Sequence, residues 1–232
     1  GWLVKAPSHR FDIAIEADLI EEISRVYGYN NLPVRTPVTS LEMAAAPEGE
    51  VTLEVICDQL VARGYHEAIT YSFVDPATQR ELDPVAEPVS LANPLSGEMS
   101  VMRTTLWTGL LKSLNYNANR QQDRIRLFET GLRFQQKPNQ ESLEFQNITQ
   151  DRMIAGVATG NRHLENWADA TQLIDFYDIK GDLETVFELT GAANSFEFSA
   201  ANHPALQRGQ SAEIRRDGNL VGYLGLLDPR IQ

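Results

Sequence analysis

The segment between Pro7 and Pro33 combines the periodicity of an amphipathic helix with a concentration of acids. After Asp12, apolar residues recur at the spacing of one helical face: Leu19, Ile20, Ile23, Val26 and Tyr27. Gly28 is placed to end this helix, and Pro33 prevents its resumption. Three acids at i, i+3 and i+4 share another face (Asp18, Glu21 and Glu22), and Asp12 precedes the helix in an extended run. We therefore expect four carboxylates to converge near the start of one helix.

Two interpretations of these acids are compatible with their spacing. In a capping box, Asp18 caps the helix, Glu21 reaches back, and Glu21 pairs with Arg25 four residues later. In a metal site, the carboxylates bind a hard divalent cation, of which Mg²⁺ is the most plausible because it prefers oxygen ligands. Four carboxylates exceed the charge of one such ion, so only some of them would touch it directly. The spacing alone leaves both interpretations open.

The segment PSHRFDIAIEADLIEEISRVYGYNNLP resembles the end of the B5 domain in the beta subunit of bacterial phenylalanyl-tRNA synthetase. That family has Pro-Ser-x-Arg-x-Asp-Ile, then Asp-Leu-Ile-Glu-Glu, then Arg-x-Tyr-Gly-Tyr. The resemblance implies Mg²⁺ binding near the alpha subunit by acids that fall on Asp12, Asp18, Glu21 and Glu22. With the resemblance included, the metal site becomes the preferred interpretation.

Composition narrows the class of protein. The 232 residues have ordinary apolar and charged fractions, and the formal net charge of −12 works against broad binding of phosphates, so nucleic acid is not the expected main partner of this fragment. The single cysteine, Cys57, lies in an apolar run and is expected to be a small core residue. No run of residues is apolar enough to span a bilayer. The chain starts as if in the middle of an element, so we interpret it as an excised fragment. With one cysteine there is no disulfide framework to indicate secretion, so a cytoplasmic location is expected.

The rest of the chain has the pattern of a second, larger module. Residues 34–50 carry Pro37, Pro47 and Gly49 and are expected to be a linker. After it, the pattern predicts helices over 51–63, 75–82 and 175–189, and another that follows residues 102–106, contains Leu110, Leu111 and Leu114, and ends near Asn119. It predicts strands over 65–74, 89–91, 124–134, 152–159 and 196–198 and a polar loop over 135–150. A hairpin is predicted over 211–227, turning at Asp217-Gly218. Strands that return through hairpins and helix-bearing connections favour an α+β fold, with an antiparallel sheet flanked by helices.

Further blocks of this module resemble the same beta-subunit family. They are the Asn-Pro-Leu-Ser run from Asn93, the Arg-Thr-x-Leu run from Arg103, the Phe-Glu-x-Gly run from Phe128 and the Asp-Phe-Tyr-Asp run from Asp175. The chain departs from the family at Gln207-Arg208, where a His-Pro pair is usual. The resemblance implies that 1–33 is the C-terminal part of a B5 domain, and that 51–232 is a B6–B7 module with the class II aminoacyl-tRNA synthetase fold.

The sequence does not predict a catalytic site in this module. A working class II site needs cationic groups on the nucleotide phosphates. Here Arg126 and Glu129 are separated by one residue more than in the usual Arg-x-Glu strand, which places them on opposite faces of a strand. Arg103 is expected to be a structural salt-bridge donor rather than a contact for a partner, and Trp107 to be a core residue.

The resemblance implies a non-catalytic assembly module of phenylalanine–tRNA ligase. In that family the alpha subunit attaches phenylalanine to tRNA(Phe) with ATP and Mg²⁺, within an α2β2 tetramer. Two alternatives stay open: a self-sufficient enzyme that binds an amino acid or nucleotide, and a nucleic-acid-binding module, since the N-terminal piece resembles a domain of DNA-binding type.

Overall fold

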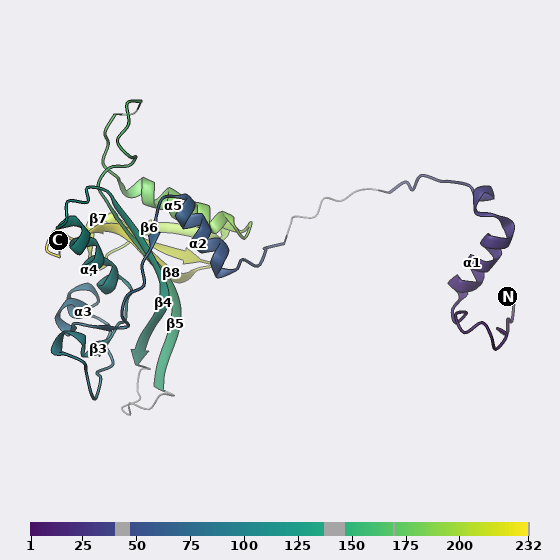
Figure 1. Cartoon of the computed structure of the whole chain (residues 1–232), viewed down its shortest axis with the longest axis horizontal. Helices are drawn as coiled ribbons and strands as arrows, with labels where there is room; N and C mark the ends of the chain where they lie inside the picture. The colour runs from purple at the N-terminus through teal and green to yellow at the C-terminus, as the bar shows by residue number, and fades with distance from the viewer. Residues whose placement is uncertain (40–46, 137–146, 169, 232) are drawn as a thin grey trace. The chain divides into compact units, whose positions relative to one another are not determined.

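The computed structural model describes residues 1–39, 47–136, 147–168 and 170–231 (Figure 1). The chain divides into two compact units, Gly1–Ala45 and Ala46–Gln232. The predicted division into 1–33, 34–50 and 51–232 stays a prediction, and much of its linker lies outside the described residues. None of the helices in the described ranges is both long and apolar enough to cross a membrane.

The first unit contains the predicted acidic helix, α1 (Glu16–Tyr27), followed by the short 3-10 helix η1 (Tyr29–Asn31). Gly28 ends α1 with φ of 95°, a conformation that favours glycine. The helix starts two residues before Asp18, so the expectation that Asp18 is the N-cap is wrong. Asp18 lies in the first turn, where its carboxylate accepts hydrogen bonds from the backbone N–H groups of Ala14 and Ile15 (2.8 and 2.9 Å).

The second unit holds the remaining helices and strands. In chain order they are α2 (Leu53–Ala62), β1 (His66–Glu67), β2 (Phe73–Val74), α3 (Pro76–Leu82), η2 (Gly97–Met99), β3 (Val101–Met102), α4 (Trp107–Ala118), β4 (Ile125–Gln136), β5 (Ile148–Thr159), α5 (Phe176–Glu188), η4 (Ala193–Ser195), β6 (Phe196–Ala200), β7 (Leu206–Arg216) and β8 (Asn219–Leu227). The predicted helices are all present.

Side-chain caps fix the starts of three of these helices. Thr52 accepts from the Val55 N–H before α2, and Asp75 accepts from the Thr78 N–H before α3. Asp175 accepts from the first turn of α5. Each cap satisfies a backbone donor that has no partner within its helix, and Pro76 follows its cap at a position that needs no N–H.

The strands form three sheets. In the first, of order β1-β4-β5, β1 is parallel to β4 and β4 is antiparallel to β5. The others are the pair β2-β3 and the antiparallel sheet β6-β7-β8. The α+β class is therefore correct, but the expectation of one antiparallel sheet is wrong. The β7–β8 hairpin turns at Asp217-Gly218, as predicted, with φ of 49° and 79° at the two turn residues.

Three predicted segments differ from the structure. The strand expected over 65–74 is two short strands, because the Thr70 N–H between them donates to the Glu129 carboxylate (3.2 Å) instead of a neighbouring strand. The strand expected over 89–91 is a single bridge, Ser90 to Val101. The loop expected over 135–150 is shorter at both ends, because polar residues such as Gln135 and Thr149 pair in the β4–β5 ladder; residues 137–146 lie outside the described part.

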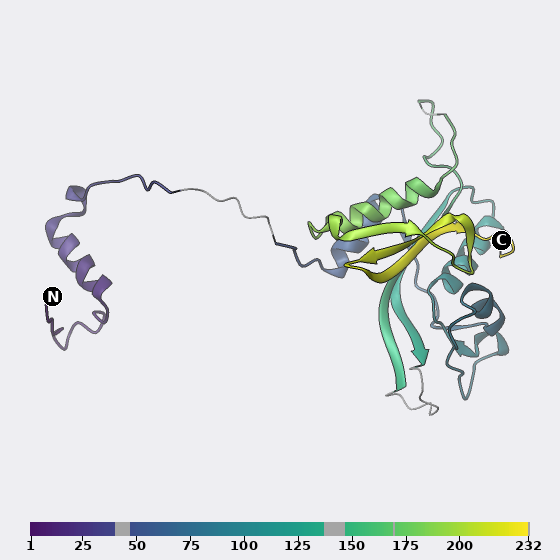
Figure 2. The same ribbon diagram turned by 180° about the vertical axis from the view of Figure 1, so that it is seen from behind.

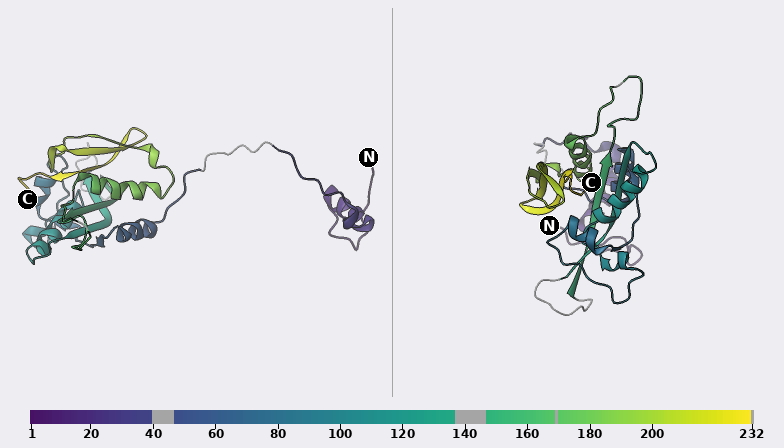
Figure 3. Two further views of the ribbon diagram at one scale, coloured as in Figure 1. Left: turned by 90° about the horizontal axis from the view of Figure 1, so that it is seen from above. Right: turned by 90° about the vertical axis from the view of Figure 1, so that its left-hand side faces the viewer.

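Helix α5 packs between two sheets (Figures 2 and 3). On one side, Val186 joins a core cluster of Leu60, Tyr65 and Phe128, which Cys57 also contacts, as predicted for a small core residue. On the other side, the Phe187 ring stacks on Phe196 of β6, with centroids 3.9 Å apart. The helix thus links the β4–β5 hairpin to the β6-β7-β8 sheet.

A second contact joins α4 to β8 through His203. The His203 ring lies 5.4 Å from the Trp107 ring and 4.6 Å from the Tyr223 ring, centroid to centroid. Trp107 is thus partly buried against this contact. Burial lowers the pKa of His203, and nearby Asp83 opposes that shift.

Candidate functional site

The four acids predicted to bind a metal lie on and before α1, but arginine side chains contact two of them. The guanidinium of Arg10 lies between Asp12 and Glu22, with N–O distances of 2.6 and 2.8 Å. Arg25 also pairs with Glu22 (2.5 Å). The expected partner of Arg25 was Glu21, the residue before Glu22. The structure therefore brings Asp12 and Glu22 together through a cation of the chain itself.

These contacts lower the pKa values of the carboxyl groups. Hydrogen bonds from Arg10 lower the pKa of Asp12 to about 2, and those from Arg10 and Arg25 lower the pKa of Glu22 to about 2. Backbone hydrogen bonds at Ile15 and Ala14 lower the pKa of Asp18. All three groups are therefore carboxylates at neutral pH, which is the state that a metal requires.

The arrangement around α1 does not fit a metal ion as it stands. The Arg10 guanidinium lies between Asp12 and Glu22, where it already supplies the positive charge that a metal ion would bring. One oxygen of Asp18 accepts hydrogen bonds from the backbone N–H groups of Ala14 and Ile15, just before α1. Within the described ranges, no three His, Cys, Asp or Glu side chains are grouped so that they could hold a metal. Binding of Mg²⁺ here would require Arg10 to move away.

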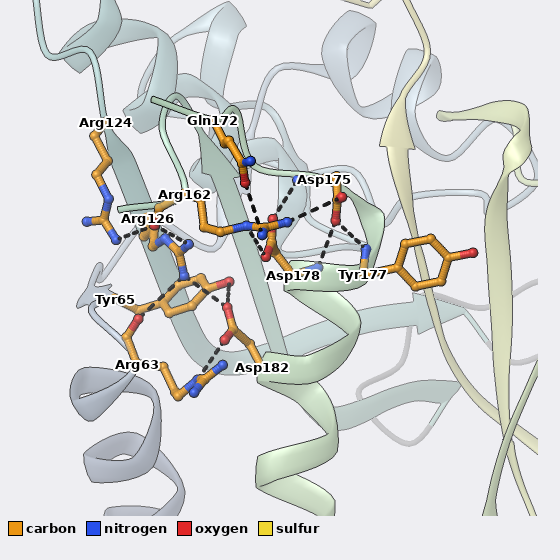
Figure 4. Close-up of polar contacts among 10 residues, drawn as sticks. All are labelled: Arg63, Tyr65, Arg124, Arg126, Arg162, Gln172, Asp175, Tyr177, Asp178 and Asp182. Carbon is orange, nitrogen blue, oxygen red and sulfur yellow. Dashed lines mark hydrogen bonds and ion pairs between the residues drawn. The ribbon is translucent and has the colours of Figure 1, made fainter. Parts of the chain in front are cut away.

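The second unit has a buried polar cluster centred on Asp182 of α5 (Figure 4). One oxygen of Asp182 accepts from the Tyr65 hydroxyl (2.9 Å) and from Arg126 of β4 (3.0 Å), and the other accepts from Arg63 (2.7 Å). Asp182, Arg126 and Tyr65 are all buried. Burial, followed by the charge of Asp182, raises the pKa of Tyr65, so this hydroxyl stays a proton donor to Asp182. The cluster ties α2, β4 and α5 together.

More arginines extend this cluster toward the start of α5 (Figure 4). Arg162 pairs with Asp178 (2.7 Å) and more distantly with Asp175 (3.5 Å), and its carbonyl accepts from Arg126 (3.2 Å). Burial opposes ionisation of Asp178, but the Asp175 N–H and Arg162 outweigh it and lower the pKa of Asp178. Burial, and then the charge of Arg126, lowers the pKa of neighbouring Arg124.

The opposite face of β4 carries a second buried ion pair. Glu129 accepts from Arg103 (2.7 Å) and from the Thr70 hydroxyl (2.7 Å), and the Arg103 Nε donates to the Leu132 carbonyl (2.9 Å). Arg103 and Glu129 side chains are each 3% exposed. Two predictions are confirmed: Arg103 is a structural salt-bridge donor, and Arg126 and Glu129 of β4 face different partners.

These two clusters favour a structural role over a catalytic one. Arg126 pairs with the Asp182 carboxylate, and Glu129 pairs with the Arg103 guanidinium. Both partners belong to the chain itself, and breaking such a buried pair from one side is costly, so the pairs hold their elements in place. Sequence reasoning missed Asp182 and Tyr65. The signal for Asp182 was present, because this acid lies on the apolar face of α5 between Ile179 and Val186, where an unpaired charge would be costly.

Comparisons with known proteins agree on one family. The family model described as the phenylalanyl tRNA synthetase beta chain CLM domain matches residues 32–232, and the tRNA synthetase B5 domain matches residues 1–29. Curated relatives include the phenylalanine–tRNA ligase beta subunits of Pseudomonas putida (52% identical over 99% of this chain) and Aliivibrio fischeri (50% over 100%). The chain spans only 28% and 29% of their lengths.

Among solved structures, a pyrrolysyl tRNA synthetase from Desulfitobacterium hafniense is similar with a TM-score of 0.47 and 16% sequence identity. The match covers 73% of this chain and 53% of that chain. This likeness is too distant to bear on the function.

Proposed function

Because the chain belongs to the phenylalanyl-tRNA synthetase beta chain family, we propose that it is a non-catalytic assembly module of that subunit. Its second unit would have the class II synthetase architecture without the class II chemistry. The alpha subunit of an α2β2 enzyme in the cytoplasm would attach phenylalanine to tRNA(Phe) with ATP and Mg²⁺, and this module would support it.

The pairing of the charged residues on β4 carries the proposal. Nucleotide activation needs cationic groups that are free to meet the phosphates as charge develops there. Arg126 is instead bound to Asp182 and to two backbone carbonyls, and Arg103 is bound to Glu129. An arginine held by a buried carboxylate would have to break that pair before it could bind a phosphate.

ATP–pyrophosphate exchange tests this function directly. The chain alone should give no phenylalanine-dependent exchange, and the same chain mixed with the alpha subunit should co-purify with it. Exchange by the isolated chain would favour a self-sufficient enzyme. Salt-sensitive binding of tRNA by the isolated chain near physiological salt would favour a nucleic-acid-binding module instead.

The Mg²⁺ site at Asp12, Asp18, Glu21 and Glu22 remains part of this proposal. Since Arg10 lies between two of these acids, the metal would bind only after the guanidinium turns away or finds another anion. Contact with the alpha subunit is one event that would allow this change.

A further inference from the structure

The connection between β5 and α5 projects from the second unit (Figure 1). Several of its large apolar side chains are exposed. Trp167 is 99% exposed, Leu164 73% and Leu173 74%, and Tyr177 in the first turn of α5 is 74% exposed. The Tyr177 ring points away from the buried arginine cluster (Figure 4). We refer to these four residues as the apolar loop surface. Exposed aromatic and aliphatic side chains gathered in one segment are typical of a binding surface.

Hydrogen bonds close the base of this loop. The Ile174 N–H donates to the Gly160 carbonyl (3.0 Å), and the Arg162 N–H donates to the Gln172 carbonyl (2.7 Å). Gly160 has φ of 87°, and a Cβ there would lie 1.8 Å from the Asp123 carbonyl oxygen, so the chain leaves β5 at a position that only glycine fits. The ion pair of Arg162 with Asp178 then ties the base to α5.

The part of the loop around Trp167 is also shaped by a side chain. The Asn166 side chain donates to the Leu164 carbonyl (3.0 Å) and accepts from the Ala168 N–H (2.9 Å). These bonds fix the backbone on both sides of Trp167, so less conformational freedom is lost when the indole binds a partner.

The charge of the loop indicates what kind of partner it fits. Between Arg162 and Asp178 the sequence has one arginine and four acids (Glu165, Asp169, Asp175 and Asp178), a formal charge of +1 − 4 = −3. Arg162 is already paired with acids of α5. A complementary surface would have an apolar pocket bordered by Lys or Arg side chains. A second copy of this chain, at a net charge of −12, would be repelled.

We propose that the apolar loop surface docks into an apolar pocket with a basic rim on the alpha subunit. This inference rests on the proposed function, because it takes the partner from there. Trp167 is the central anchor, Leu164 and Leu173 extend the apolar contact, and Glu165 meets the basic rim.

The test is the affinity between the complete beta subunit and the alpha subunit, measured by calorimetry. Trp167→Ala should weaken binding by about tenfold or more, as for an interface anchor. Leu220→Ala, which removes a partly exposed apolar side chain of β8, is the matched control and should leave the affinity unchanged. Glu165→Lys should weaken binding and reduce the dependence of the affinity on salt. The melting temperatures of the Trp167→Ala and Glu165→Lys variants should equal that of the unmodified chain, because these two side chains are exposed.

The possible results separate this inference from the proposed function. If the unmodified subunit binds the alpha subunit and Trp167→Ala binds equally well, the docking surface is wrong and the proposed function stands. If the unmodified subunit does not bind at all, the proposed function fails and the inference fails with it. If Trp167→Ala instead abolishes self-association seen without the alpha subunit, the occupant is a second copy and the alpha-subunit assignment is overturned.

Discussion

At the scale of single residues, replacing Asp182 by asparagine removes the charge that faces Arg126 and Arg63 while keeping the size of the side chain. Arg126 would then be a buried cation without its carboxylate. We expect the free energy of unfolding to fall by about 3 kcal/mol, the cost of breaking a buried pair from one side. Urea unfolding followed by circular dichroism measures this loss.

The control for this variant is Glu184→Gln on the same helix. Glu184 pairs with Lys180 at a partly exposed site, so its loss should change the free energy of unfolding by less than about 0.5 kcal/mol. Equal effects of the two substitutions would contradict a structural role for the Asp182 cluster.

His203 provides a pH-dependent prediction. Its folded-state pKa is lowered, so the protonated form favours the unfolded chain. Stability attributable to His203 should be complete above the ordinary histidine pKa of about 6.5 and lost as the pH falls through the lower folded value. His203→Asn should reduce the difference between unfolding midpoints at pH 7.5 and pH 5, whereas the exposed His163→Gln should not.

The sequence identified single residues unevenly. Arg126 and Glu129 were placed on opposite faces correctly because strand alternation decides which way side chains point. Arg103 was predicted to be a structural salt-bridge donor from its position before a helix, which its pair with Glu129 confirms. Helical spacing placed Asp18, Glu21 and Glu22 on one helix, but it says nothing about Arg10, which comes from the preceding segment and binds Asp12 and Glu22.

At the scale of elements, two glycines in helices should respond oppositely to alanine. A Cβ on Gly109 in α4 would lie 2.0 Å from the Thr70 hydroxyl, whereas one on Gly181 in α5 would meet nothing within 4 Å. Gly109→Ala should therefore destabilise the protein by about 1–3 kcal/mol through overpacking. Gly181→Ala should stabilise it by about 0.5–1 kcal/mol, because alanine has less freedom to lose on folding.

Thermal and urea unfolding of the two variants give the sign of each effect. A stabilising Gly109→Ala would show that α4 does not approach Thr70 as closely as described. A destabilising Gly181→Ala would point instead to a contact on that face of α5.

Helices and the hairpin were predictable because their signals are local. Asp75-Pro76, Asp175 and Asp217-Gly218 each act on residues within a few positions. The prediction of one continuous strand over 65–74 was wrong for a non-local reason: Thr70 binds Glu129, which is 59 residues away in the sequence. The same limit explains why the division into three sheets was not predicted.

At the scale of the whole molecule, the metal hypothesis concerns assembly. Asp18→Asn and Glu22→Gln should weaken Mg²⁺ binding and association with the alpha subunit while leaving the second unit folded. Calorimetry with Mg²⁺ and co-purification with and without chelator measure the two effects. If both variants assemble with the alpha subunit as well as the unmodified chain does, with and without chelator, the metal hypothesis is wrong. The control is Glu16→Gln, a substitution in the same helix outside the proposed ligand set.

The two ion pairs on opposite faces of β4 also have a consequence for how the strand finds its neighbours. Sliding β4 by one residue against β5 would exchange its faces. Arg126 would then turn away from Asp182, and Glu129 away from Arg103. Such a misaligned hairpin would separate both buried pairs, Arg126–Asp182 and Arg103–Glu129, so these charges disfavour the slipped alignment in addition to the apolar pattern.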